Sequence, residues 1–291
     1  MQRTARNSTP LTIQNSLDET YRRRAVAPGS TRFWAWLLAP PEIRPPLLGI
    51  LALLAEWQAL MDPATEAGVA RIKLAWWQEE MQRLSLGVPV HPIGRYLAQF
   101  ARAEESGCAA LNATLAAAAD QVAGVPIERA VDIPAHANCL WGEPHLVALR
   151  LGVKSAETID ASLLECASAL ASADYLARAI AGYRRDAAAG RVPFAIDELL
   201  SAGIETADLA ALEPPRRLQD YLSQLRTQAA RHYATALEAP QGRQRALGRH
   251  LLVLAAIGLR QVTGGHAPSE QPRLREAFAA WRIARRAAAG K

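Results

Sequence analysis

The sequence predicts an all-α protein that folds as a single domain. Half of its 291 residues are hydrophobic, which is typical of a globular chain with a sizeable core. Alanine is abundant and β-branched and aromatic residues are modest, a balance that favours helices over strands. Apolar residues recur at helical spacing, and no stretch shows the sustained alternation of a strand. One helical domain around a large internal core is the simplest architecture.

Proline and glycine residues divide this pattern into segments. We expect helices over residues 31–38, 43–61, 64–85, 92–123, 134–152, 158–188, 195–202, 216–237, 242–263 and 271–288. Residues 1–29 are polar and lack the apolar core of a signal peptide, so we expect a flexible tail ahead of a domain over residues 30–291. The longest apolar run, Leu47 to Met61, is interrupted by Glu56 and is too short to span a bilayer.

The charged and sulfur-containing residues exclude several classes of site. The net charge is +5 and comes almost entirely from arginine, which indicates either an anionic partner or a codon bias towards Ala and Arg; we favour the bias. The 3 cysteines form no CxxC pair and the 6 histidines no HExxH motif, so we expect neither a disulfide framework nor a zinc site. No motif combining basic and aromatic residues supports nucleic-acid binding, which we do not expect.

The stretch DPATE at residues 62–66 shows how capping residues can imitate a metal site. Asp62 and Glu66 are four residues apart, so one helical face could present both to a cation. Pro63, however, favours the first position of a helix. We therefore interpret Asp62 as the N-cap and Glu66 as an acid near the positive end of the helix.

The next helix contains RIKLAWWQEEM, residues 71–81. Trp76 and Trp77 are adjacent and so point about 100° apart, which lets one enter the core while the other faces a neighbouring helix or a cavity. We expect Glu79 and Glu80 to be solvated.

The C-terminal stretch LREAFAAWRIARRAAAG has apolar residues at helical spacing and many arginines. It could lie on a membrane surface. A terminal helix docked on its own domain is the commoner arrangement, and we favour it.

Several segments, in this order and spacing, resemble the squalene/phytoene synthase family. They are PGSTRFWAWLLAPPEIRPPLLGILALLAEW (28–57), RIKLAWWQEEM with HPI (71–93), GRVPFAIDELLSAGI (190–204) and AARHYATALEAP (229–240). The resemblance implies the isoprenoid synthase fold, a single helical domain around a central apolar cavity. It also implies two aspartate-rich stretches that hold Mg²⁺ at the cavity mouth, where catalytic members join two prenyl diphosphates head to head.

The second aspartate-rich stretch of the family falls on the helix that ends near residue 188. Asp186 matches its last acid, but Gly182 stands where the first acid is expected. Arg178 replaces an expected asparagine and Arg185 an expected acid, while Arg191 keeps the family's Gly-Arg pair. The resemblance therefore leaves Asp186 as a weak candidate metal ligand, with Arg178, Arg185 and Arg191 as candidate ligand-binding residues.

The first aspartate-rich stretch falls on AEWQALMD, residues 55–62. Glu56 is the acid nearest the expected place, and no acid pairs with it at four residues. If catalysis survives with displaced ligands, the set would be Glu56, Asp62, Glu66 and Asp186 around Mg²⁺. Trp77 is a further candidate for contact with a ligand.

These departures favour a divergent member that is non-catalytic or weakly catalytic and binds an isoprenoid or another apolar lipid. The quoted helices resemble most the branch that includes the mitochondrial complex I assembly factor with a squalene/phytoene-synthase-like domain, so a protein partner is a second expectation. The alternative is an active prenyltransferase that condenses two prenyl diphosphates with Mg²⁺. We expect a cytoplasmic location with peripheral association at the inner membrane.

Overall fold

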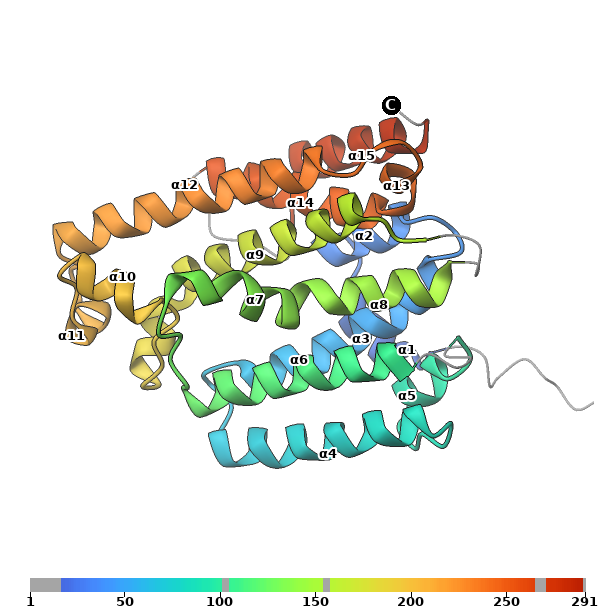
Figure 1. The fold of residues 1–291 in the computed structure, drawn as a ribbon, viewed down its shortest axis with the longest axis horizontal. Helices are drawn as coiled ribbons and strands as arrows, with labels where there is room; N and C mark the ends of the chain where they lie inside the picture. Colours follow the sequence, from blue (N-terminus) through green and yellow to red (C-terminus); the bar gives the residue numbers. More distant parts are fainter. Residues whose placement is uncertain (1–16, 101–104, 154–157, 265–270, 290–291) are drawn as a thin grey trace, which may run out of the picture.

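The computed structural model describes residues 17–100, 105–153, 158–264 and 271–289, and all regular secondary structure in these residues is helical (Figure 1). The α-helices are α1 (Glu19–Ala25), α2 (Thr31–Leu38), α3 (Arg44–Met61), α4 (Ala67–Ser85), α5 (Pro92–Leu97), α6 (Glu105–Ala123), α7 (Ile133–Ala137), α8 (Glu143–Gly152), α9 (Ala161–Ala188), α10 (Ile196–Ser201), α11 (Thr206–Ala210), α12 (Arg216–Glu238), α13 (Gly242–Leu247), α14 (Arg249–Thr263) and α15 (Leu274–Ala288). A short 3₁₀-helix lies at Ala130–Asp132 and a π-helix at Asn138–Gly142. The all-α prediction is confirmed.

Three of the expected segments are divided further. Residues 92–123 contain α5 and α6, and residues 242–263 contain α13 and α14, which meet at Gly248. Residues 134–152 hold α7, the π-helix and α8 in succession. Because a π-helix widens one turn, it changes the direction in which the following side chains point.

The stretch expected to be a tail contains a helix. α1 lies within residues 1–29 and packs against α3, and Leu17, Ala25 and Val26 are buried. Residues 17–29 are therefore part of the helical body, because burial of this apolar side compensates for the ordering of the chain. Residues 1–16 lie outside the described part of the chain.

The long helices run side by side in layers, with α4 at one side of the molecule and α15 at the other (Figure 1). α9 packs against α12, α12 against α14, and α14 against α15, while α3 lies between α1 and α8. α10 and α11 lie at one end of α9 and α12 (Figure 1). This arrangement surrounds α3 and α9 with other helices, so their faces line the interior.

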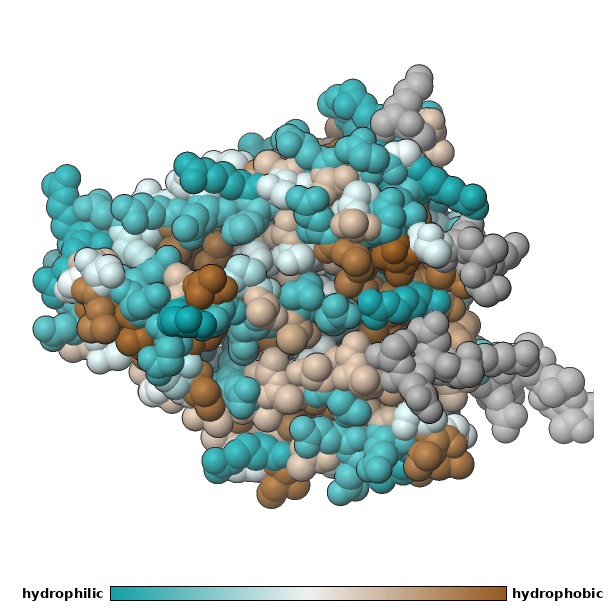
Figure 2. All heavy atoms as spheres, in the orientation of Figure 1, coloured by the Kyte–Doolittle hydropathy of each residue, from teal (hydrophilic) through white to brown (hydrophobic). Residues whose placement is uncertain are grey.

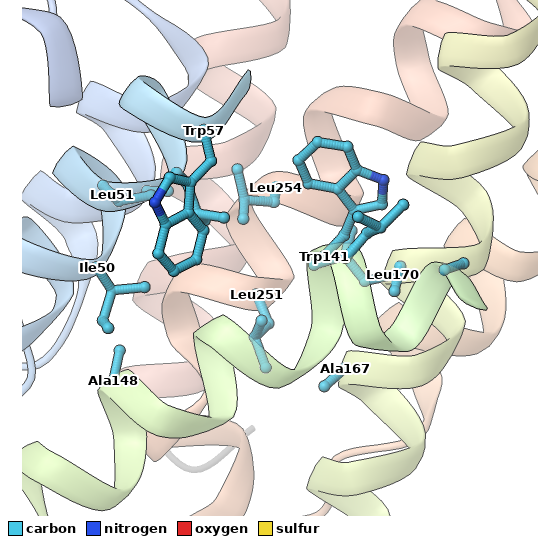
Figure 3. Close-up of a cluster of buried hydrophobic side chains, with 14 of the residues drawn as sticks. Ile50, Leu51, Trp57, Trp141, Ala148, Ala167, Leu170, Leu251 and Leu254 are labelled. Carbon is cyan, nitrogen blue, oxygen red and sulfur yellow. The ribbon is translucent and has the colours of Figure 1, made fainter. Parts of the chain in front are cut away.

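α3 is the central helix of the core. Its residues 46–54 are all buried, as expected for a helix that is apolar on every side. Figure 3 shows Ile50 and Leu51 of α3 in one cluster with Leu251 and Leu254 of α14 and with residues of α8 and α9. The helix interrupted by Glu56 in the sequence is therefore a core helix, as its length indicates.

α15 docks on the domain through a row of small residues. Ala277, Ala280, Ala284 and Ala287 are buried, and the helix packs closely against α14. The prediction of a docked terminal helix is confirmed for this face.

Two expectations about acidic residues are wrong. Glu66, not Asp62, is the N-cap of α4, and its carboxylate accepts hydrogen bonds from the Gly68 and Val69 amides at 2.9 and 3.1 Å. Glu80 is fully buried rather than solvated, because its carboxylate accepts the Val90 and His91 amides and the guanidinium of Arg83. A carboxylate that collects several donors is stable without water.

On the face shown in Figure 2, hydrophilic residues alternate with moderately hydrophobic ones, and the most hydrophobic residues form separate patches. None of the helices in the described part of the chain combines the length and the apolar character needed to cross a membrane.

Candidate functional site

Two cavities adjoin each other along α9. The first, of about 130 Å³, is lined by Arg24 of α1, Arg32 of α2 and Arg178 of α9, and we call it the arginine cavity. Its apolar wall comes from α3, α14 and the π-helix, through Leu51, Leu54, Leu254 and Trp141. Both polar groups and hydrocarbon line the cavity, so it suits an amphiphilic molecule.

The second cavity, of about 90 Å³, is lined by Asp186 and Arg191 and by residues of α6 and α7, and we call it the Asp186 cavity. Arg178 and Trp141 line both cavities. The guanidinium of Arg178 lies 4.7 Å from the centre of the Trp141 ring, a cation–π contact. This pair therefore forms the partition between the two cavities, and the π-helix places the ring there.

Asp174 is the carboxylate of the arginine cavity, four residues before Arg178 on the same face of α9. The Tyr233 hydroxyl on α12 donates a hydrogen bond of 2.6 Å to its Oδ1 atom. Burial raises the pKa of Asp174, although Arg178 and this hydrogen bond oppose the rise. Gly258 of α14 makes the contact feasible, because a Cβ atom there would overlap the Tyr233 ring.

α3 holds two of the arginines in place. The Glu56 carboxylate accepts a hydrogen bond of 2.9 Å from the Arg24 guanidinium, and Gln58 accepts one from Arg32. The Arg24 side chain of this pair is 61% exposed and the Glu56 side chain 23%, so the pair lies at the surface and contributes more to the orientation of Arg24 than to stability. Two neighbouring α3 positions thus position cations at the cavity.

A neutral histidine completes the cavity wall. His145 of α8 is buried and lines the arginine cavity, and its Nδ1 atom has no hydrogen-bond partner. Burial and the nearby charge of Arg32 lower its pKa to about 4. Its ring lies 5.4 Å from that of His250, whose pKa burial also lowers. Both rings are therefore uncharged at neutral pH.

Asp186 is surrounded mainly by charged residues, two of them arginines of its own segment. Burial raises the pKa of its carboxyl, Arg191 and Arg185 oppose the rise, and the charge of Asp62 adds to it. Arg191 is buried and its Nη1 atom donates a hydrogen bond of 2.7 Å to the Met61 carbonyl, which ties the end of α9 to the end of α3. Gly190, at a φ of 72°, makes the turn before it.

A family model for squalene/phytoene synthase matches residues 25–264. The chain belongs to the squalene/phytoene synthase family. No curated protein matches the sequence closely enough to be a relative. Two solved structures share its architecture. A dehydrosqualene synthase, solved in complex with a ligand, has a TM-score of 0.69 at 16% identity and covers 91% of this chain and 96% of its own. The squalene synthase HpnC from Alicyclobacillus acidocaldarius has a TM-score of 0.63 at 17% identity, covering 84% of this chain and 91% of its own.

These comparisons confirm the predicted family and isoprenoid synthase fold. The match of the family model begins at residue 25, in the last turn of α1. At identities of 16% and 17%, the solved structures support the fold alone. The chemistry of this chain has to be inferred from its own residues.

The residues present do not fit a Mg²⁺–diphosphate site of the squalene/phytoene synthase type. Among the described residues, no group of three or more Asp, Glu, His or Cys side chains could hold a metal ion. Of the displaced set, Glu66 caps α4 and Glu56 binds Arg24, which leaves Asp62 and Asp186 beside two arginines. Mg²⁺ prefers several carboxylate and phosphate oxygens in octahedral geometry, and guanidinium groups repel it.

Gly182 leaves open the place of the acid that the family pattern expects. A Cβ atom at this position would lie 3.2 Å from Asp186 Oδ2 and 3.8 Å from Arg185 Nη2. The Asp186 carboxylate and the Arg185 guanidinium thus extend over this position. A second carboxylate there would meet Asp186 directly, with Arg185 beside both.

The structure brings together only part of the predicted site. Arg178, Asp186 and Arg191 line cavities, and Arg185 is exposed next to Asp186. Trp77 is not among the residues that line either cavity. Its ring packs 6.1 Å from that of Trp57 and 4.6 Å from that of His91.

Sequence reasoning missed most of the arginine cavity. Arg24 was placed in the tail, and nothing in the sequence linked Arg32 or His145 to α9. Asp174 carried a usable signal, because residues 174, 178, 182 and 186 follow at four-residue spacing and share one face of α9.

Proposed function

We propose that this protein binds an isoprenoid or a similar apolar lipid in its helical cavity and does not condense prenyl diphosphates at an ordinary enzymatic rate. The observation that supports this most is the separation of the candidate acids. Asp186 faces one cavity, while Glu56 is engaged by Arg24 at 2.9 Å. Condensation requires cations to neutralise the leaving diphosphate, and these acids do not gather around one.

Two measurements test this function. Mass spectrometry of the protein purified under native conditions is expected to find an apolar molecule in stoichiometric amount. Incubation with farnesyl or geranylgeranyl diphosphate and Mg²⁺ is expected to release no pyrophosphate above the rate of the heat-denatured protein. Rapid Mg²⁺-dependent release that Asp186→Ala abolishes would overturn the proposal.

The competing function is an active prenyltransferase with displaced ligands. One observation favours it: the charge of Asp62 raises the pKa of Asp186, so these two acids lie within electrostatic range of each other. A conventional Mg²⁺ site needs further oxygen ligands from substrate and water. The pyrophosphate assay distinguishes the two functions.

A scaffold role like that of the assembly-factor branch would need a protein-binding surface. Val69, Ile72 and Trp76 follow helical spacing along α4 and are 42%, 73% and 38% exposed. These residues belong to the helix that carries the resemblance to that branch. If this face binds a protein, Ile72→Asp should abolish the complex and leave lipid binding in the cavity unchanged.

Peripheral membrane association is part of the proposal. Leu274, Phe278 and Trp281 are exposed on the outer face of α15, with Arg285 4.9 Å from the Trp281 ring. Apolar residues bordered by arginines suit the surface of an anionic bilayer. Co-sedimentation should be stronger with vesicles of phosphatidylglycerol and phosphatidylcholine than with phosphatidylcholine alone. Phe278→Ser with Trp281→Ser should abolish it, and Leu212→Ser, at another exposed apolar residue, should not.

A further inference from the structure

We propose that the arginine cavity binds the phosphate or diphosphate head of an isoprenoid directly through arginine side chains, with no metal ion. This inference rests on the proposed function and names the chemical class of its ligand. It differs from metal-assisted binding in the cation that neutralises the head group.

The first observation is the charge of the cavity lining. Arg24, Arg32 and Arg178 come from three helices and line one cavity of about 130 Å³. Among the described residues of this lining, Asp174 is the one carboxylate, so the cationic groups exceed the anionic ones by two. Guanidinium groups present paired N–H donors that match the oxygens of a phosphate.

The second observation is how the remaining charges are held. The Tyr233 hydroxyl donates a hydrogen bond of 2.6 Å to Asp174. Glu56, which is outside the lining, accepts a hydrogen bond from Arg24 and so orients it. Gln58, which is part of the lining, does the same for Arg32. Glu56, a candidate metal ligand by sequence, is thus a positioning residue for Arg24. Oriented arginines lose less conformational freedom when a ligand binds.

The third observation is a set of neutral polar groups at the same cavity. Ser30 and Thr31, at the N-terminus of α2, line it, and this end of a helix favours negative charge. His145 lines it too, and its buried Nδ1 atom has no partner. Leu51, Leu54 and Leu254 supply apolar lining that would hold the hydrocarbon chain.

The test compares ligands that differ only in the head group. Farnesyl thiodiphosphate, which resists loss of its diphosphate, and farnesol are titrated by calorimetry into the full chain, in EDTA and in Mg²⁺. Charge-assisted hydrogen bonds should make the thiodiphosphate bind at least about 10-fold more tightly than farnesol in EDTA. Inorganic pyrophosphate should compete with it in EDTA.

Arg178→Gln is the decisive variant, since it keeps hydrogen-bonding capacity but removes the charge. It should weaken thiodiphosphate binding about 10-fold and change farnesol binding less than about 2-fold. The matched control is Arg226→Gln, an exposed arginine of α12 outside the cavity linings, which should change neither. Arg178 is exposed, so circular dichroism should show both variants folded.

The outcomes separate this inference from the proposed function. If neither ligand binds, the proposed function itself fails. If farnesol and the thiodiphosphate bind equally, or Arg178→Gln weakens both alike, lipid binding stands and the arginine head-group site is wrong. If the thiodiphosphate binds only with Mg²⁺, the metal-free site is overturned.

Discussion

One face of α9 carries two pairs of residues at the same four-residue spacing, and the fold treats the pairs differently. Asp174 and Arg178 meet groups from other elements, the Tyr233 hydroxyl at 2.6 Å and the Trp141 ring at 4.7 Å. At Gly182 and Asp186, the favourable charges are Arg185 and Arg191 of the same segment of chain, and the charge of Asp62 from the end of α3 opposes them.

This difference shows that helical spacing along α9 is not sufficient for a binding site, because complementary groups must also come from other helices. A metal–diphosphate site needs carboxylates from two facing helices, and here α3 directs Glu56 to Arg24 instead. Asp174 and Arg178, which we call the inner pair, receive complementary groups from α12 and from the π-helix. We therefore place ligand recognition at the inner pair, and the following experiments test that assignment.

The largest expected effect is the pH dependence of the folding stability that His145 of the arginine cavity causes. His145 has a pKa of about 4 in the folded protein, below its ordinary value of 6.5. As the pH falls, His145 is protonated in the unfolded chain before it is protonated in the folded protein. Its contribution to stability is therefore fully present above about pH 6.5 and is lost progressively as the pH drops towards about 4. The loss from this group should be about 2 kcal/mol at about pH 5 and approach about 3 kcal/mol below pH 4.

The measurement is urea unfolding at about pH 7.5 and about pH 5, for the wild type and His145→Gln. The variant should lose less stability on acidification, by about 2 kcal/mol. His232→Gln, at a half-buried position outside the cavity linings, is the control and should reduce the loss less. Asp186 should act in the opposite direction, because its raised pKa keeps the proton in the folded state. Equal acid sensitivity of wild type and His145→Gln would contradict the assignment.

The two glycines on the compared surfaces should respond in opposite ways to alanine. At Gly258 the new Cβ atom would overlap the Tyr233 ring, so Gly258→Ala should destabilise the fold by about 2 kcal/mol. At Gly182 the nearest atom is the movable Asp186 Oδ2 at 3.2 Å, and Gly182→Ala should stabilise α9 by up to about 1 kcal/mol. Thermal unfolding checks both. If Gly182→Ala is destabilising, the glycine is required because no side chain fits at this position.

The hydrogen bond between α12 and α9 should matter more than a similar bond outside the cavity. Tyr233→Phe removes the donor to Asp174, and leaving this partly buried carboxylate short of a partner should lower the free energy of unfolding by about 1 to 2 kcal/mol. The pKa of Asp174 should then rise further, because the bond favours its ionised form. Tyr221→Phe removes a comparable 2.8 Å bond to Glu198 and provides the comparison. A smaller loss at Tyr233 than at Tyr221 would argue against a desolvated carboxylate that depends on this hydrogen bond.

Helical periodicity and proline positions predicted the architecture well, because they depend on local sequence. The segments at 31–38 and 43–61 match α2 and α3 within one residue. α1 was missed because its stretch of polar residues hides the small buried side at Leu17, Ala25 and Val26. The division of residues 134–152 by a π-helix also carried no signal in the periodicity.

The site was predicted less completely, because its contacts join distant parts of the chain. Asp186 and Arg191 were predicted by matching a motif at and beyond the end of α9, and both line the Asp186 cavity. The pairs Arg24–Glu56 and Tyr233–Asp174 are 32 and 59 residues apart, and spacing along one helix cannot reveal them. The sequence pointed to Glu56 but not to its partner Arg24. Without that partner, Glu56 was interpreted as a candidate metal ligand.

The smallest effect on stability should come from Asp186→Asn. Burial and the charge of Asp62 disfavour its charge while Arg191 and Arg185 favour it, so removal of the charge should change the free energy of unfolding at neutral pH by less than about 1 kcal/mol. Binding of farnesyl thiodiphosphate in EDTA should not change. Asp174→Asn removes the carboxylate of the arginine cavity and should strengthen that binding several-fold, because an anion would no longer be repelled. If Asp186→Asn instead abolishes binding and Asp174→Asn has no effect, the ligand is recognised at Gly182 and Asp186, and the Asp186 cavity is the binding site.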